Sequence, residues 1–119
     1  MDELGVTTEA VPGATVLSVS GEIDLHTAPS LRAALEPAVR SAREQGTAVV
    51  VDLTAVSFLD STGLGELVGA NKALAISGDR LHVVAVGDRL PRLLGLTGLT
   101  EVLAVHESLT DALAGITRT

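Results

Sequence analysis

Two hydroxyl groups stand beside a carboxylate in the run Asp60-Ser61-Thr62-Gly63-Leu64-Gly65. The run follows an apolar stretch, residues 48–51, and opens a segment with helical hydrophobic spacing, so we place it at the start of a helix. A helix N-terminus offers backbone N–H donors and a dipole that favours negative charge, and the glycines leave the approach open. These residue types in this position suit the addition and removal of a phosphate group.

A structural explanation competes with this one, because Ser and Asp are also among the residues that most often cap helices. From the local spacing alone, a cap is the commoner role for Ser61. Gly63 and Gly65 shift the balance, since each costs a helix about 1 kcal/mol relative to Ala. Close approach of another molecule would explain both glycines, and Asp60 can cap the helix while Ser61 stays free. We therefore favour a phosphate acceptor at Ser61.

Other chemistry at this run finds less support. The glycines at positions 63, 65 and 69 nearly match a dinucleotide-binding fingerprint, but the last spacing is one residue too long. We also expect the preceding strand to end near Leu53, too far upstream for a tight phosphate-binding turn. A hydrolase built from Ser61, His26 and Asp24 would need the loop at 21–26 to fold over the helix start, and no Gly-x-Ser-x-Gly elbow is present. The three histidines lack metal-ligand spacing, so we expect no catalysis, metal or cofactor.

The composition of the chain argues against several further classes. Among its 119 residues Phe58 is the single aromatic, so stacking platforms for single-stranded nucleic acid are essentially missing. A net charge of −7 with 8 Lys and Arg residues disfavours duplex DNA and anionic membranes as partners and favours a protein with a basic face. The lack of cysteine excludes disulfides and thiolate sites. The acidic N-terminus has no signal core and no apolar run reaches membrane-spanning length, so we expect a cytoplasmic protein.

The elements that must position the run begin with a hairpin. Strands at 6–10 and 15–20 flank the turn Pro12-Gly13 and should pair antiparallel, followed by a loop at 21–26. Thr27 is a suitable cap for the next helix. Pro37 should kink that helix or stop it early, and Gly46 should end it.

Strands and helices alternate over the rest of the chain. We expect strands at 48–53, 81–86 and 102–105, and helices after Asp60, from Asp88 through Leu96, and after Ser108. Strands that alternate with helices imply parallel pairing. The sequence therefore predicts one α/β domain over residues 1–119. It should have a mixed, mostly parallel sheet, an N-terminal antiparallel hairpin and about four helices packed mainly on one face.

At these residues the chain resembles a known family. Residues 60–65, which follow Val56-Ser57-Phe58-Leu59, look like the phosphorylation motif of bacterial anti-sigma factor antagonists, which are stand-alone STAS domains. Gly21-Glu22-Ile23-Asp24, followed by Thr27, is similar to the loop between the second strand and first helix of that family. Residues 93–99 resemble its third-helix region. The resemblance covers nearly the whole chain, and the Asp-Ser-x-Gly-Leu-Gly segment is its most specific part.

The resemblance implies a cycle of partner switching. The unphosphorylated antagonist binds an anti-sigma factor that is also an ATP-dependent serine kinase, and a sigma factor is released. The kinase then phosphorylates the Ser that follows the motif Asp, and a metal-dependent serine phosphatase resets the protein. By position the acceptor is Ser61, and we expect an exposed Leu64 on the docking surface with the segment 90–96 nearby. The partner-binding residues implied are Asp24, Asp60, Thr62, Gly63, Leu64 and Gly65.

Two positions depart from the family pattern and leave the particular partner undetermined. Thr62 stands where many relatives have a second Ser, and Leu94 replaces a common Phe. Asp24 also has a local explanation, an Asx-type bond that supports its own loop. Because one fold can host several roles, two alternatives stay open. They are a subunit of a transport or signalling complex without the switch, and a nucleotide or small-ligand module that uses a cleft between Asp24 and Ser61.

Overall fold

The computed structural model describes residues 4–117 and shows a five-stranded sheet in the order β1-β2-β3-β4-β5. β1 and β2 pair antiparallel, and the other neighbours pair parallel. The α/β fold class and the order of its elements are as predicted, with one added 3-10 turn. The elements are β1 (Gly5–Val11), β2 (Ala14–Ile23), α1 (Ala28–Gln45), β3 (Ala48–Leu59), α2 (Ser61–Ala75), β4 (His82–Val84), α3 (Arg89–Leu96), η1 (Leu99–Glu101), β5 (Ala104–His106) and α4 (Leu109–Thr117).

Two strands are longer than the sequence predicts. β2 continues through Ile23 and β3 through Leu59, so the predicted loop at 21–26 begins only at Asp24. The register between them shifts twice, between Ser18 and Ser20 and again between Gly21 and Glu22. Each shift breaks the two-residue alternation that marks a strand in a sequence. The extension carries both strands directly to the residues singled out above.

Helix α1 passes through Pro37 without ending, so of the two predicted outcomes, a kink or an early stop, the stop is wrong. The ring of Pro37 is exposed, and the helix continues because Ala38, Val39 and Ala42 beyond it are buried. Their burial offsets the lost backbone hydrogen bond of a helical proline, a penalty of about 3 kcal/mol. Gly46 ends the helix as predicted, with a positive φ of 68° and its N–H bonded to the carbonyl of Ala42.

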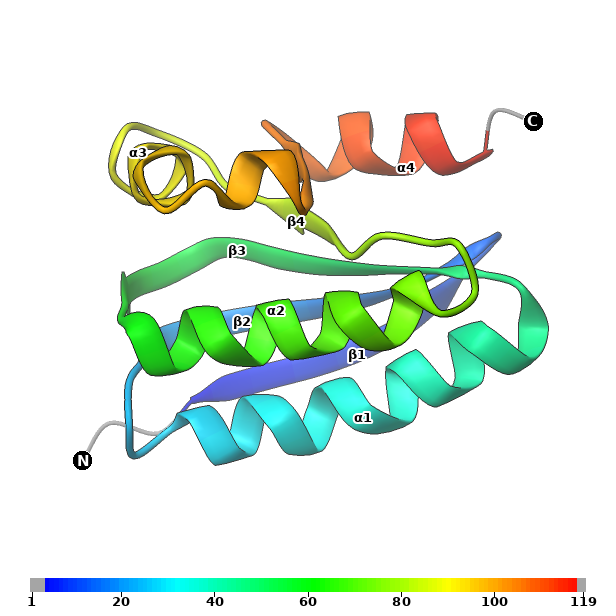
Figure 1. Ribbon diagram of the computed structural model, residues 1–119, viewed down its shortest axis with the longest axis horizontal. Helices are drawn as coiled ribbons and strands as arrows, with labels where there is room; N and C mark the ends of the chain where they lie inside the picture. Colours follow the sequence, from blue (N-terminus) through cyan, green and yellow to red (C-terminus); the bar gives the residue numbers. More distant parts are fainter. Residues whose placement is uncertain (1–3, 118–119) are drawn as a thin grey trace.

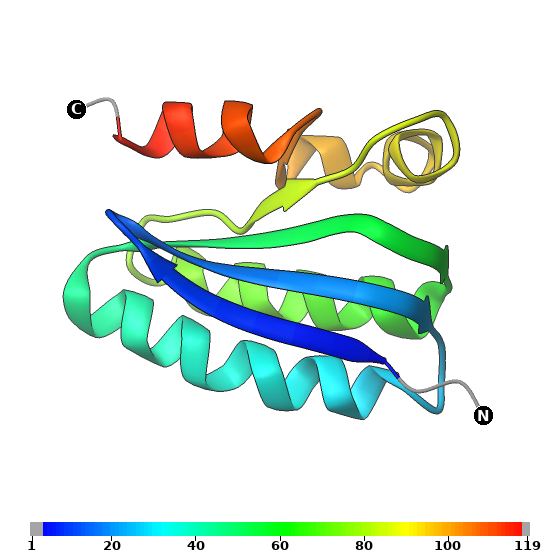
Figure 2. The same cartoon turned by 180° about the vertical axis from the view of Figure 1, so that it is seen from behind.

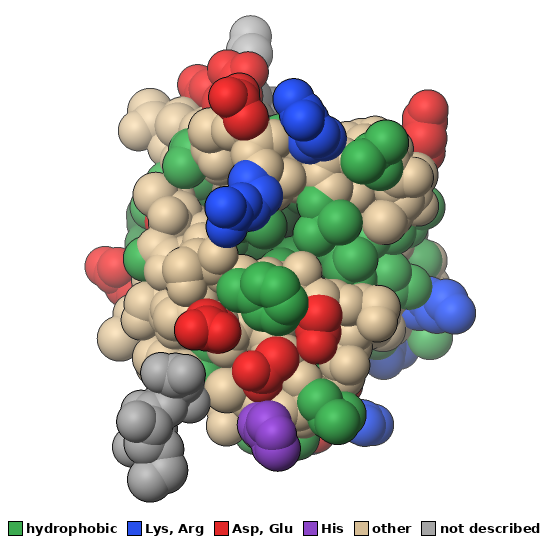
Figure 3. Space-filling view, turned by 90° about the vertical axis from the view of Figure 1, so that its left-hand side faces the viewer, with side chains coloured by type: hydrophobic (Ala, Val, Ile, Leu, Met, Phe, Trp, Pro, Cys, Tyr) green, Lys and Arg blue, Asp and Glu red, His purple; other side chains and the backbone are tan. Residues whose placement is uncertain are grey.

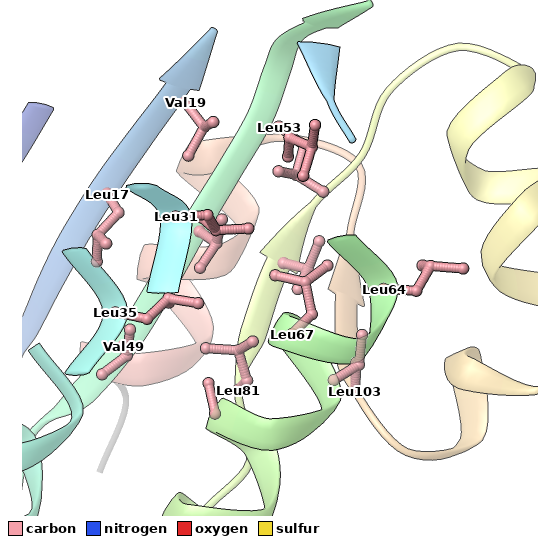
Figure 4. Packing of buried hydrophobic residues seen from close by; sticks show 14 of the residues in the cluster. Leu17, Val19, Leu31, Leu35, Val49, Leu53, Leu64, Leu67, Leu81 and Leu103 are labelled. Carbon is pink, nitrogen blue, oxygen red and sulfur yellow. The ribbon is translucent and has the colours of Figure 1, made fainter. Parts of the chain in front are cut away.

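Helices α1 and α2 lie side by side on one face of the sheet (Figure 1). The larger core lies beneath them (Figure 4). Leu90 and Leu94 of α3 also belong to it. α4 packs on the opposite face, where Ala112 joins a smaller cluster with Val16 and Val50. Figure 2 shows β1 and β2 from that side, and α4 packs against only one end of them. The helices therefore lie mainly on one face, as predicted, with α4 as the exception.

The edge formed by β4 and β5 is short and is held by side-chain hydrogen bonds. Asn71 of α2 is buried, and its Oδ1 accepts from the N–H of Leu81 at 2.7 Å. His82 Nδ1 lies 2.9 Å from His106 Nε2 on the neighbouring strand, with the rings stacked. Burial lowers the pKa of His82, and the nearby His106 and Arg80 lower it further.

Over residues 4–117, no helix is both long and apolar enough to cross a lipid bilayer.

Candidate functional site

The carboxyl ends of two parallel strands bring the two predicted carboxylates together. Ile23 at the end of β2 and Leu59 at the end of β3 are paired in register. The N–H of Asp60 donates to the carbonyl of Ile23 at 3.1 Å, so the residue after β3 is bonded to the last residue of β2. Asp24 and Asp60 therefore lie at the same edge of the sheet, beside the start of α2 (Figure 1). Binding sites of parallel sheets commonly form at this edge.

Asp60 is the N-cap of α2, and Ser61 is the first residue of the helix. The Asp60 carboxylate accepts from the N–H of Thr62 at 2.9 Å and from the N–H of Gly63 at 3.1 Å. Ser61 is exposed and leaves the capping to its neighbour, whereas Thr62 is half-buried. One expectation changes as a result. The backbone donors thought to favour a phosphate are already bonded to the carboxylate of Asp60.

The loop between β2 and α1 is built around Asp24 and Thr27. The Asp24 carboxylate accepts from the N–H of His26 at 2.9 Å and of Thr27 at 3.0 Å, which is the Asx-type turn considered above. The Thr27 hydroxyl donates to the carbonyl of Glu22 at 2.7 Å and accepts from the N–H of Asp24, rather than capping α1. The bond from the Thr27 N–H is the main cause of a lowered pKa for Asp24, which partial desolvation opposes. The loop thus holds an ionised carboxylate at the site.

Gly63 has a structural role within this chain, whereas the sequence suggested that it makes room for another molecule. An added Cβ at this position would lie 2.5 Å from both Ile23 Cγ2 and Leu59 Cδ1. The first turn of α2 therefore rests on the ends of β2 and β3, and no side chain larger than hydrogen fits between them. The groups that come close to Gly63 are side chains of this chain, from Ile23 and Leu59.

Leu64 and Gly65 differ from each other in exposure. Leu64 retains only 9% of its exposed surface and lies within the main core (Figure 4), so the expected exposed leucine between glycines is wrong. Gly65 is exposed, and an added Cβ would have no heavy atom within 4 Å. Only Gly65 of the two glycines is open to an approaching molecule.

Replacing each of these two glycines with alanine should shift stability in opposite directions. Gly63→Ala should lower the free energy of unfolding by about 1–3 kcal/mol, because its methyl group overpacks Ile23 and Leu59. Gly65→Ala should raise it by about 0.5–1 kcal/mol, because alanine favours an exposed helix. Urea unfolding of both variants checks the pair. Equal effects of the two substitutions would contradict the packing described for Gly63.

Three exposed apolar residues lie at the same end of the sheet as the site and were not recognised in the sequence. Leu25, Phe58 and Val86 are exposed at or just beyond the carboxyl ends of β2, β3 and β4. Phe58 is 46% exposed although it is the only aromatic residue of the chain. Figure 3 shows this end of the molecule, with hydrophobic side chains between acidic groups on one side and Lys or Arg on the other. A solvent-facing aromatic residue beside polar groups is typical of an interaction surface.

Helix α3 contributes less to this surface than expected. In the predicted docking segment 90–96, Leu90 and Leu94 point into the core, while Leu96 is exposed. Arg89, just before the segment, donates from Nη1 to the carbonyl of Ser57 at 3.3 Å, which joins α3 to the end of β3. The helix therefore presents Arg89, Arg92 and Leu96 to solvent beside the site.

The structure also tests the dinucleotide-binding site and the hydrolase that were considered from the sequence. β3 runs directly into the cap of α2, so the expected strand end near Leu53 was wrong, but the glycines at 63, 65 and 69 lie inside the helix rather than in a phosphate-binding loop. The Asp24 carboxylate bonds the backbone N–H of His26 and not its imidazole. Residues 4–117 contain no cluster of three or more His, Asp or Glu side chains that could hold a metal ion.

Comparison with known proteins agrees with this description. The family model of the STAS domain matches residues 5–112. An anti-sigma-B factor antagonist of Staphylococcus aureus is 41% identical over 92 residues, which cover 76% of this chain and 82% of that protein. The corresponding protein of Listeria monocytogenes is 45% identical over 87 residues, 73% of this chain and 74% of its own.

A solved structure extends the agreement to three dimensions. The crystal structure of an anti-sigma factor antagonist from Mycobacterium paratuberculosis is 36% identical to this chain and superposes with a TM-score of 0.80. The superposition covers 95% of this chain and 93% of the solved one. The resemblance first noted at residues 60–65 is thereby confirmed. The chain belongs to the STAS domain family and, within it, to the anti-sigma factor antagonists, which are regulatory proteins rather than enzymes.

Proposed function

We propose that the unmodified protein binds an anti-sigma factor that is also a serine kinase, and that phosphorylation of Ser61 ends this binding. Binding releases a sigma factor, and a serine phosphatase later removes the phosphate. The cycle takes place in the cytoplasm, where ATP and the transcription machinery are found. The observation that carries the proposal is the exposed Ser61, which directly follows the N-cap Asp60 at the edge where Asp24 is also held.

The exposure of the two hydroxyl residues supports Ser61 over Thr62 as the acceptor. Ser61 is exposed at the first position of α2, whereas Thr62 is half-buried and its N–H is bonded to Asp60. A kinase must bring the γ-phosphate of ATP in line with the attacking hydroxyl oxygen. Ser61 allows that approach without movement of the helix.

The local charges support loss of binding after phosphorylation. A phosphate adds about −1.5 to −2 charges at Ser61. The N–H groups of Thr62 and Gly63 are already bonded to Asp60, so the new dianion gains little from them and lies beside a carboxylate instead. A hundredfold loss of affinity needs about 2.7 kcal/mol. Desolvation of a dianion and the added bulk in a tight interface can supply a penalty of that size.

The proposal is tested by affinity capture from the source cell with two baits. The unmodified protein should retain a kinase of the anti-sigma type, and the Ser61→Asp protein should not. Incubation of the purified pair with ATP should then add the mass of one phosphate to the antagonist. A kinase that binds both baits equally, or no phosphate on the intact protein, would refute the switch while leaving the fold assignment untouched.

A charged side chain at Gly65 should weaken this binding. Gly65→Glu places bulk and negative charge on the exposed first turns of α2, where an added Cβ has no heavy atom within 4 Å. We expect at least a tenfold increase in the dissociation constant for the kinase, about 1.4 kcal/mol, with little change in thermal unfolding. Gly115→Glu is the matched control, because Gly115 is equally open but lies on α4 across the sheet. Equal affinities of the two variants would move the interface away from α2.

A further inference from the structure

The outer face of α1 carries a row of charges that alternate in sign. Arg32, Glu36, Arg40 and Glu44 follow one another at intervals of four residues, and all four are exposed. Residues four apart lie on the same side of a helix, so the four side chains form one stripe about 18 Å long. Arg32 and Glu36 form an ion pair at 3.4 Å within the helix. The four charges sum to zero, but positive and negative charges alternate along the stripe.

A groove runs beside this stripe between α1 and α2. It has a volume of about 840 Å³, and the four charged residues of the stripe line it together with Arg43 of the same helix. On the opposite side α2 contributes the small residues Gly65, Gly69 and Ala73 at successive turns, with Glu66 as its one charged lining residue. Small residues at this spacing allow the backbone of another helix to come close. The shape of the groove therefore fits a helix.

We propose that the helix in this groove is α1 of a second copy of the same chain, arranged antiparallel. Reversal of the sequence of charges exchanges each positive position with a negative one. In an antiparallel pair, Arg32 of one copy therefore faces Glu44 of the other, and Glu36 faces Arg40. Each of these contacts occurs twice about a two-fold axis near residue 38, which is the arrangement of an isologous dimer. A parallel pair would instead place like charges against each other.

The two-fold arrangement leaves the site at Ser61 free. α1 and α2 both begin at the same end of the molecule (Figure 1), so an antiparallel dimer carries its two Ser61 sites at opposite ends. The ridge of each α1 fills the groove of the other copy, and the α2 helices lie to the outside. Gly65 lines the groove, so the dimer and the kinase would compete for the first turns of α2, whereas Ser61 itself does not line the groove.

The test uses two double variants that reverse charges on α1 alone. Arg32→Glu with Arg40→Glu makes the stripe wholly acidic, and Glu36→Arg with Glu44→Arg makes it wholly basic. Sedimentation equilibrium between about 10 μM and 1 mM should show a dimer for the wild type and at least about tenfold weaker self-association for each variant. An equimolar mixture of the acidic and basic variants should restore the dimer.

Two outcomes would overturn the proposal. One is a wild-type protein that stays monomeric at the highest concentration, which would leave the groove to some other occupant. The other is a mixture of the two variants that fails to recover the dimer, which would mean that the stripe serves only ion pairs within its own helix. Arg89→Glu with Arg92→Glu, on α3, is the control for net charge and should leave the dimer unchanged. Circular dichroism of each variant verifies that it is folded.

Discussion

Ser61→Ala is expected to abolish phosphate incorporation while leaving the binding of the kinase intact. The substitution removes the hydroxyl of the first residue of α2 and adds no charge or bulk to the surface. Loss of labelling should be complete, because the half-buried Thr62 is held by its N–H bond to Asp60 and cannot take the place of Ser61. Mass spectrometry after incubation with kinase and ATP measures the labelling, and calorimetry measures the binding.

The stability of the same variant provides a second check. Because Asp60 and not Ser61 caps α2, Ser61→Ala should change the free energy of unfolding by less than about 0.5 kcal/mol. Asp60→Ala should lower it by about 0.5–2 kcal/mol through loss of the cap. Phosphate mapped to Thr62, or normal labelling of Ser61→Ala, would disprove the assignment of the acceptor.

Phe58→Ala should cause a large loss of partner affinity with little loss of stability. The ring is 46% exposed, one residue before the end of β3 and two before the N-cap Asp60, and a partner that covers it would bury most of the remaining surface. Truncation of an aromatic residue at the centre of an interface typically costs about 2 kcal/mol or more, which corresponds to about 30-fold in the dissociation constant. Titration calorimetry with the kinase measures this change.

Ile76→Ala is the matched control for that experiment. Ile76 is 74% exposed, but it lies just past the last residue of α2, at the opposite end of the helix from Ser61. Removing it should alter the affinity by no more than about twofold, because surface residues outside an interface contribute little to binding. If Ile76→Ala weakens binding and Phe58→Ala does not, the partner binds the other end of the molecule.

Much of the fold could be predicted because its signals are local. Pro12-Gly13, Gly46 and Asp88 stand at turns and helix ends that the structure contains. The ends of β2 and β3 could not be predicted in the same way. Their two register shifts remove the alternation of buried and exposed residues, and only pairing between distant segments reveals that they are strands. The continuation of α1 past Pro37 likewise depends on burial against the sheet, which propensity alone cannot show.

The candidate site shows the same division. Asp60 as a cap and Asp24 in an Asx-type turn follow from hydrogen bonds within a few residues, so the sequence allowed both. The role of Gly63 depends on Ile23 and Leu59, which come from two strands that pair only in the folded chain. Leu64 is buried, as its hydrophobicity suggests, because it packs in one cluster with Leu90 and Leu94 of α3, although its neighbouring glycines suggested an exposed position. Phe58 is exposed, against what hydrophobicity suggests for an aromatic residue.

The bond from Asp60 to Ile23 and the tight seat of Gly63 have a consequence for how information passes through this protein. They fix the first turn of α2 to the sheet, so the modified and unmodified forms should share one backbone conformation. No rare conformer has to be populated before recognition, and affinity is not reduced by such a population. In the proposed cycle, a phosphatase would then distinguish the two forms only by contact with the phosphate itself. The phosphorylated and unphosphorylated forms would therefore differ only at the surface around Ser61.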